Sequence, residues 1–278
     1  MMFFASVALY LTVRKSLLIK TPSSLTNLAM FAIPLLVYAT MGLSTHQSYS
    51  ISAPHFLLLV IAAVVFAYGG NTLSLKAIDI APNPGYSLVL SKSYVLFTTI
   101  VAVLFLHADL SWRKAVAILV IVGFSGLIMI NKKGAKHVKS NRWMLLSFGS
   151  FFAWGSLSLT SKYLFNHGLG TIPWLIYLYA IVTACILVAN KMRKSSFRNL
   201  SKQRWVLLIG TGIFSTLFNL GQFEAIKVAP NVGYVNAINA GSIALVTVLA
   251  VILFKDELTK KKAVGILGVT LGLLLLLV

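Results

Sequence analysis

The feature that most constrains the fold is a series of apolar runs, each about 20 residues long and separated from the next by a short polar break. A helix of that length can cross the roughly 30 Å hydrocarbon core of a bilayer. Hydrophobic residues make up 58% of the chain and charged residues only 10%, against about 25% charged in a typical globular domain. These proportions exclude an ordinary soluble fold, and we expect an integral, multi-pass membrane protein.

The apolar runs predict ten transmembrane helices and an all-α fold. A signal peptide is the competing interpretation of the first run, but its charges, Arg14 and Lys15, follow the apolar stretch, whereas those of a signal peptide precede it. We therefore interpret it as a helix. The expected ranges are 1–19, 24–43, 56–78, 83–106, 111–130, 142–165, 171–190, 204–226, 231–254 and 259–278.

The sequence also repeats internally. Residues 77–86 recur, with seven of ten positions identical, as residues 225–234, a displacement of 148 residues. Over 71–130, 18 of 60 positions are identical to their counterparts at the same displacement, with no gap. Such self-similarity indicates that one structural unit occurs twice.

The repeat predicts two five-helix copies, 1–130 and 142–278, joined by a basic linker, 131–141. The first helix lacks a counterpart of 142–148, so we expect it to be short or truncated. Because each copy has an odd number of helices, the second must enter the membrane upside down relative to the first. Inverted repeats are typical of alternating-access transporters, whose substrate site lies near the membrane midplane between the copies.

These motifs resemble the EamA-type branch of the drug/metabolite transporter superfamily. The most specific part is 254–278, where the acidic pair Asp256–Glu257 and a Leu-Thr step precede a Gly-rich last helix. The first copy keeps this pattern at 107–111 with one acid fewer. The resemblance covers essentially the whole chain and implies a permease that exports metabolites, amino acids or drugs. It leaves the substrate open.

The charge is strongly basic, with 24 Lys and Arg against 5 Asp and Glu and a net charge of +19. The basic residues cluster in the polar breaks, so we expect a lipid bilayer as partner and no nucleic acid. If the helices alternate, 19 of 23 loop-associated basic residues share one side, which the positive-inside rule places in the cytoplasm. This predicts both termini outside a plasma (inner) membrane, whereas the resemblance implies both inside.

The sequence holds no pattern typical of an enzyme or a metal site. It has no His-Glu-x-x-His, Gly-x-Ser-x-Gly or Walker motif, so we expect neither catalysis nor a cofactor. Cys185 is the single cysteine, which excludes an intrachain disulfide and a Cys-based metal site. The acids fall at helix ends or in loops, which disfavours multidrug cation antiport; they are Asp79, Asp109, Glu224, Asp256 and Glu257.

Lys92 is the one ionisable residue expected deep in the membrane. It follows Pro82–Asn83, the expected start of the fourth helix, by nine residues, which places it about 14 Å into the bilayer. Its counterpart in the second copy is Ala240, so the charge is not required by packing common to both copies. Lys92 is therefore a candidate to pair with an anionic substrate group. The alternative is a lysine that bonds to carbonyls and hydroxyls at a helix interface, or snorkels.

Polar residues on neighbouring helices are further candidates for substrate binding. Buried amides need partners, which either a substrate or another helix can supply. The matched pair Asn71 and Asn219 favours helix–helix contact, because both copies have it, whereas Asn236 and Asn239 occur in one copy and favour a cavity. The full candidate set is Lys92, Ser91, Asn236, Asn239, Asn71, Asn219, Gln222 and Trp154, the last being either a pocket wall or a core residue.

Glycines at 265, 268 and 272 give the last helix a face that a second helix can approach closely. This Gly265–Gly268–Gly272 face predicts either a homodimer seam or close contact within one chain.

Together these patterns predict a secondary transporter, most simply an exporter, of a small anionic or zwitterionic metabolite such as an amino acid. A nucleotide-sugar antiporter of the same superfamily is the alternative within transport, because Lys92 could then meet a phosphate. A lipid flippase-like protein or a non-transporting membrane scaffold is the alternative from another class.

Overall fold

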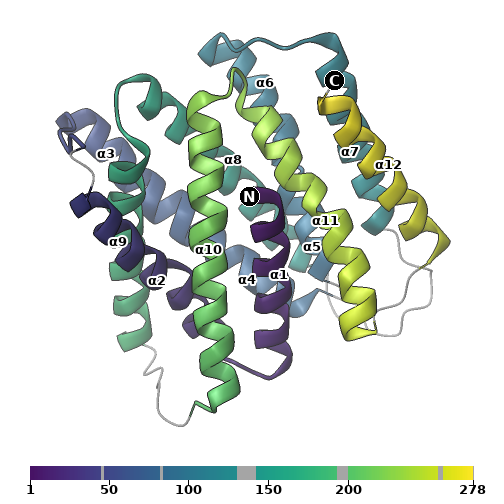
Figure 1. Ribbon diagram of the computed structural model, residues 1–278, viewed down its shortest axis with the longest axis horizontal. Helices are drawn as coiled ribbons and strands as arrows, with labels where there is room; N and C mark the ends of the chain where they lie inside the picture. Colours follow the sequence, from purple (N-terminus) through teal and green to yellow (C-terminus); the bar gives the residue numbers. More distant parts are fainter. Residues whose placement is uncertain (45–46, 82–83, 130–141, 193–199, 256–258, 278) are drawn as a thin grey trace. The chain divides into compact units, whose positions relative to one another are not determined.

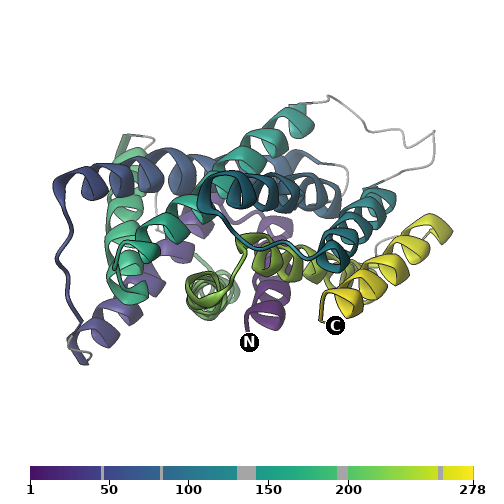
Figure 2. The ribbon, with the colours of Figure 1, turned by 90° about the horizontal axis from the view of Figure 1, so that it is seen from above.

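The computed structural model describes residues 1–44, 47–81, 84–129, 142–192, 200–255 and 259–277. Within these ranges the chain forms helices joined by turns and short loops, with no strand (Figures 1 and 2). The predicted all-α fold is therefore confirmed. The predicted linker 131–141 and the acidic pair at 256–257 lie outside the described residues.

Each of the ten expected ranges coincides with a helix or with a run of consecutive helices. The elements are α1 (Met2–Leu18), α2 (Ser23–Ser44), α3 (Ala53–Ile61), η1 (Ala62–Gly69), α4 (Gly70–Ile80), α5 (Pro84–Lys92), α6 (Tyr94–Leu106), α7 (Trp112–Met129), α8 (Arg142–Asn166), α9 (Thr171–Met192), α10 (Lys202–Val228), α11 (Val232–Phe254) and α12 (Lys260–Leu277).

Among the residues that the structure describes, five helices are long and apolar enough to cross a membrane. They are Ser23–Ser44, Ala53–Ile80, Thr171–Met192, Lys202–Val228 and Val232–Phe254. Two shorter apolar helices, Leu90–Leu106 and Ala263–Leu276, add to them. Length and apolarity are the properties that bilayer crossing demands, so the chain is an integral, multi-pass membrane protein.

Two expected helices are not uniform. The helix through 53–80 contains a π-helical stretch, η1, between α3 and α4. The helix expected over 83–106 is broken at Ser93. The φ of Ser93, −62°, is helical, but its ψ of −4° departs from the α-helical ψ of about −42°. The expectation of one continuous helix over 83–106 was therefore wrong.

The chain divides into two compact units, each of which combines helices from both sequence copies. Unit 1 comprises Met1–Thr72 and Thr160–Val228, and unit 2 comprises Leu73–Leu159 and Ala229–Val278. These spatial units do not coincide with the two sequence copies, so they do not test the sequence repeat. The copies 1–130 and 142–278 remain a prediction.

In unit 1, α1 lies against α10, and α2 lies against both α9 and α10. Its interior holds an aromatic group in which the ring of Tyr179 lies 5.0 Å from Phe31 and 5.3 Å from Tyr38, centroid to centroid. The Tyr38 hydroxyl donates a hydrogen bond of 2.8 Å to the main-chain oxygen of Thr216 on α10. The buried phenol thereby satisfies its polar atom while joining two helices.

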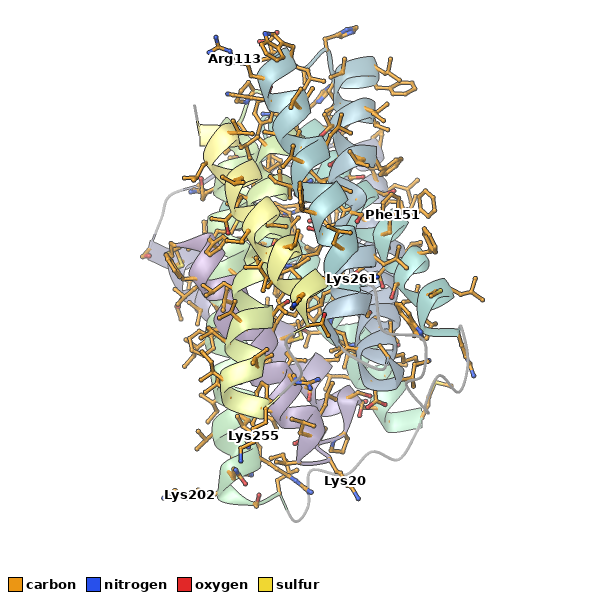
Figure 3. All side chains as sticks on the ribbon, turned by 90° about the vertical axis from the view of Figure 1, so that its right-hand side faces the viewer. Lys20, Arg113, Phe151, Lys202, Lys255 and Lys261 are labelled. Carbon is orange, nitrogen blue, oxygen red and sulfur yellow. The ribbon has the colours of Figure 1, made fainter. Side chains whose placement is uncertain are left out.

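Basic side chains cap helices at both ends of unit 1. Arg204, in the first turn of α10, donates to the main-chain oxygen of Ile19 just after α1, at 3.1 Å. Lys20 and Lys202 lie at the same end of the unit (Figure 3). At a different helix end, Lys162 Nζ donates to the oxygen of Lys227 in the last turn of α10, at 3.0 Å. The carbonyls at a helix C-terminus favour such cations.

In unit 2, α7 and α12 run side by side (Figure 1), and α11 contacts α5, α6, α7 and α12. The α7–α12 contact depends on two glycines. A Cβ on Gly268 would overlap the ring of Phe124, and a Cβ on Gly272 would lie 2.7 Å from Ile121 Cγ1 and 3.0 Å from the Ile121 main-chain nitrogen. These two glycines therefore permit close approach within one chain, as one of the two alternatives predicted. A homodimer through this face stays a prediction.

Candidate functional site

Lys92 is the last residue of α5 and lies directly before the break at Ser93. It is eight residues from the start of α5 and fourteen from the end of α6, or about 12 Å and 21 Å along the helix axis. Only 1% of its surface is exposed, so the amine does not reach water by snorkelling. The side chain is buried deep along this helix pair, as the sequence predicted.

Three neutral oxygens accept hydrogen bonds from Lys92 Nζ, and all belong to α11 of the same unit. They are Asn239 Oδ1 at 2.8 Å, Ser242 Oγ at 3.1 Å and the main-chain oxygen of Asn239 at 3.3 Å. The Ser242 hydroxyl gives its own proton to the Asn239 main-chain oxygen at 2.6 Å, which leaves its lone pairs toward the lysine. Each of these three contacts therefore presents an acceptor to the amine, as a protonated lysine requires.

The hydrogen bonds continue from Asn239 along the seam between α6 and α11. Asn239 Nδ2 donates to the Tyr94 hydroxyl at 3.5 Å, and the two polar atoms Tyr94 Oη and Asn236 Oδ1 are 3.3 Å apart, with Tyr94 donating. Asn236 Nδ2 then donates to Thr98 Oγ1 at 3.0 Å. We call Lys92, Tyr94, Thr98, Asn236, Asn239 and Ser242 the Lys92 network.

The Lys92 network is polarised in one direction. Beginning at Lys92, each group donates to the next one outward, and Thr98 ends the chain by donating to the main-chain oxygen of Val95 at 3.1 Å. The negative end of the first amide dipole, Asn239 Oδ1, thus faces the amine. In a low-dielectric interior, dipoles aligned in this way stabilise a positive charge and reinforce one another.

Hydroxyl side chains accompany the helix break. Ser91 Oγ donates to the main-chain oxygens of Ser87 at 2.8 Å and Leu88 at 3.3 Å, and Ser147 Oγ on α8 donates to Ser87 Oγ at 2.9 Å. Serine and threonine hydroxyls are the groups that satisfy backbone carbonyls near breaks in transmembrane helices. These bonds join Ser91 to its own helix and not to Asn239, its counterpart in the repeat.

Trp154 lies beside the Lys92 network. Its ring and the ring of Tyr94 meet edge to face with centroids 6.4 Å apart. The next residue, Gly155, lets α8 approach closely, because a Cβ there would lie 3.4 Å from Tyr94 Cβ and would crowd the ring of Phe97. The structure therefore brings Trp154 together with Lys92, Asn236 and Asn239 in unit 2.

The other three candidates, Asn71, Asn219 and Gln222, belong to unit 1. Asn71 Nδ2 donates to Asn27 Oδ1 on α2 at 2.7 Å, which is the helix–helix contact predicted for it. Asn219 Nδ2 instead donates to the main-chain oxygen of Ser215, one turn earlier on its own helix, at 2.8 Å. Gln222 is buried one turn beyond Asn219.

Sequence reasoning missed Tyr94, Thr98 and Ser242 as members of the Lys92 network. A signal for them existed, because Asn236, Asn239 and Ser242 recur every three residues on one helix, and Tyr94 and Thr98 are four apart on the other. Residues at these spacings share a helix face. No group of three or more His, Cys, Asp or Glu side chains that could hold a metal ion occurs among the described residues.

Comparison with known proteins places the chain in a family. Residues 141–278 match the model of the EamA-like transporter family. A crystal structure of another protein is similar over 99% of this chain and 94% of its own, with a TM-score of 0.79 and 14% sequence identity, which shows a shared fold. A comparison with curated proteins finds no significant match. The match over the second copy confirms the resemblance noted in the sequence, and the chain belongs to the EamA-like transporter family.

Proposed function

We propose that the protein is a secondary transporter, acting as an exporter in the plasma (inner) membrane, for a small anionic or zwitterionic solute such as an amino acid. It works by alternating access, with ten membrane-spanning helices in two inverted copies. The binding site is the Lys92 network, where Lys92 of the first copy bonds to Asn239 of the second and Tyr94 of the first bonds to Asn236 of the second. The observation that carries the proposal is a buried lysine, at a helix break, that donates to three uncharged oxygens of α11.

The three uncharged oxygens that accept from Lys92 are weaker partners for an ammonium group than an anion would be. Burying a cation away from water is costly, and neutral oxygens offset that cost only in part. A carboxylate that reached Lys92 would add a charge-assisted hydrogen bond and a Coulomb attraction strengthened by the low-dielectric interior. A zwitterion would also find an amide and a hydroxyl group for its ammonium group in Asn236 and Tyr94.

The helix break supports the same site. In secondary transporters, substrates bind where transmembrane helices are discontinuous, because the interrupted backbone offers polar groups at membrane depth. The α5–α6 break at Ser93 directly follows Lys92. Unit 2 also supports inversion, because Asp109, just after α6, accepts through its main-chain oxygen from Asn231 and Tyr234 at the start of α11. The two counterpart helices are therefore antiparallel, as inverted copies require.

Two other functions have a specific observation in their favour. A nucleotide-sugar antiporter would use Lys92 to meet a phosphate. A non-transporting scaffold would use the Lys92 bonds to Asn239 and Ser242 only to hold α5 against α11. Saturable flux in proteoliposomes would exclude the scaffold, and competition by amino acids but not by nucleotide sugars would exclude the antiporter.

The experiment that tests the proposal is a thermal-shift screen of the purified protein against a metabolite library. A ligand that binds only the folded form raises the melting temperature, by an amount that grows with its concentration. We expect carboxylate-bearing metabolites to produce shifts in the wild-type protein and to lose them in Lys92→Met. A set of hits without any anionic group, with equal shifts in the two proteins, would contradict the proposal.

A further inference from the structure

We propose that Asn239 is a latch that occupies Lys92 in the substrate-free protein and is displaced by the carboxylate of the transported solute. The inference rests on the proposed function and goes beyond it, because it gives Asn239 the role of a competitor of the substrate. It also makes substrate binding the event that disconnects α5 from the side chain of Asn239 on α11.

The geometry at Lys92 Nζ carries the first step. Asn239 presents two of its own oxygens to the same amine, Oδ1 at 2.8 Å and the main-chain oxygen at 3.3 Å. A carboxylate also presents two oxygens from one group, and it binds an ammonium more strongly than an amide does, because it carries a full charge. Asn239 thus occupies the position that an anionic substrate group would take, with a weaker acceptor.

The second step concerns which of the two oxygens can leave. The main-chain oxygen of Asn239 is fixed within α11 and also accepts from Ser242 at 2.6 Å. The side-chain oxygen can move, because rotatable bonds separate it from the main chain, and the bond from Asn239 Nδ2 to the Tyr94 hydroxyl, at 3.5 Å, is the longest of the Lys92 network. A rotation about the Asn239 side-chain bonds therefore frees Oδ1 from the amine and leaves the helix intact.

The third step concerns the rest of the network. When Asn239 turns away, Tyr94 keeps its bond to Asn236, and Asn236 keeps its bond to Thr98. Displacement of the Asn239 side chain therefore breaks its bonds to Lys92 and Tyr94 and leaves the bonds of Asn236 in place. The second copy has no equivalent latch, because Lys92 and Asn239 correspond in the repeat to Ala240 and Ser91, neither of which carries a charge.

The test compares variants of the full-length protein for binding of the standard L-amino acids, tested one at a time. Asn239→Ala removes the competing side-chain oxygen and keeps the main-chain one, so the tightest-binding amino acid should bind up to about tenfold more tightly. Asn239→Asp places a fixed carboxylate against Lys92, so binding should weaken by at least about tenfold. The carboxamide of the same amino acid should bind poorly to the wild-type protein and to both variants.

Asn236→Ala is the matched control. It removes an equally buried amide of α11, whose bonds to Tyr94 and Thr98 lie further along the Lys92 network. We expect its affinity for the same amino acid to stay at or below the wild-type value. Asn239→Leu, which keeps the side-chain volume, repeats the test if the alanine variant does not elute as a folded, monodisperse protein.

The outcomes separate the latch from the proposed function. If the wild-type protein binds amino acids and Asn239→Ala or Asn239→Leu binds them more weakly, Asn239 is a direct substrate ligand and the latch is overturned, while the proposed function stands. If the wild-type protein and Lys92→Arg bind no amino acid, the proposed function fails, and the latch fails with it.

Discussion

The helix pair α5–α6 and the helix α11 occupy the same place in the two sequence copies, yet they differ in continuity and in the residues that each gives to the proposed site. Both begin within an Ala-Pro-Asn-x-Gly-Tyr element, and both extend over 23 positions, 84–106 and 232–254. The first is broken at Ser93 and carries Lys92 and Tyr94. The second is continuous and carries Asn236 and Asn239. The polar groups of the proposed site are therefore divided between the two sequence copies.

A threonine that the two copies share makes the same hydrogen bond in both. Thr99 and Thr247 are counterparts, and each donates to the main-chain oxygen four residues earlier, at 2.7 Å and 2.8 Å. In contrast, the counterparts Lys92 and Ala240, and Tyr94 and Ser242, differ in chemistry. Differences between the copies thus identify the candidate site better than polarity alone.

The largest expected effect is the all-or-none labelling of counterpart loops. If the copies are inverted, residues just after α6 and just after α11 lie on opposite sides of the membrane, and Arg113 and Lys255 already lie at opposite ends of unit 2 (Figure 3). In a Cys185→Ala background, a membrane-impermeant thiol reagent should label Asp109→Cys in intact cells and spare Lys255→Cys. The reverse pattern would place the termini inside, and labelling of both would contradict inversion.

Removal of the Tyr94 hydroxyl should have the next largest effect. Tyr94→Phe leaves a buried amide donor of Asn239 and the Oδ1 acceptor of Asn236 without this partner, at a cost of about 1–3 kcal/mol of stability. Tyr234→Phe is the matched control, because its hydroxyl bonds to the Asp109 main-chain oxygen at an exposed position, where water can replace it. Equal losses of melting temperature in the two variants would contradict the account.

Asn71 and Asn219 should differ despite their equivalent positions. Asn71→Ala removes a bond between α4 and α2 and should cost about 1–2 kcal/mol, within the range measured for polar contacts between membrane helices. Asn219→Ala removes bonds within α10 only and should cost about half as much or less. Chemical unfolding in mixed micelles measures both. A larger loss for Asn219→Ala would mean that its role is not local.

The smallest effects are expected for the shared threonines. Thr99→Val and Thr247→Val each remove a hydroxyl that donates to a carbonyl of its own helix, so each should cost less than about 1 kcal/mol. The same unfolding measurement should give equal values within about 0.5 kcal/mol, which is the precision of such differences. A marked inequality would show that shared residues have diverged in role.

Much of the fold could be predicted from the sequence, because hydrophobic length dictates where membrane helices lie. The prediction placed 24–43 and 171–190 close to α2 and α9, which are themselves offset by 148 residues. The break at Ser93 was not predicted, because neither Pro nor Gly stands at that position and only local bonding marks it. The π-helical stretch η1 likewise has no sequence signal.

The candidate site was predicted in part. Burial of Lys92 followed from depth along a helix, but its partners depend on the register between α5 and α11, which are about 150 residues apart in sequence. The different bonding of Asn71 and Asn219 depends on a neighbour. Asn71 meets Asn27, whereas the counterpart of Asn27 is Leu175, which offers no polar atom. Identical residues in equivalent positions therefore need their neighbours before a role can be assigned.

Transport by Lys92 variants in proteoliposomes tests the central claim most directly. Lys92→Met keeps the length of the side chain and removes its charge, so uptake of the amino acid that binds wild type should be abolished, with affinity reduced about a hundredfold or more. Lys92→Arg should retain part of both, and melting temperatures on the same preparations should show that both variants fold. Full transport activity in Lys92→Met, with an unchanged or raised melting temperature, would show that Lys92 serves only the helix interface and would contradict the account.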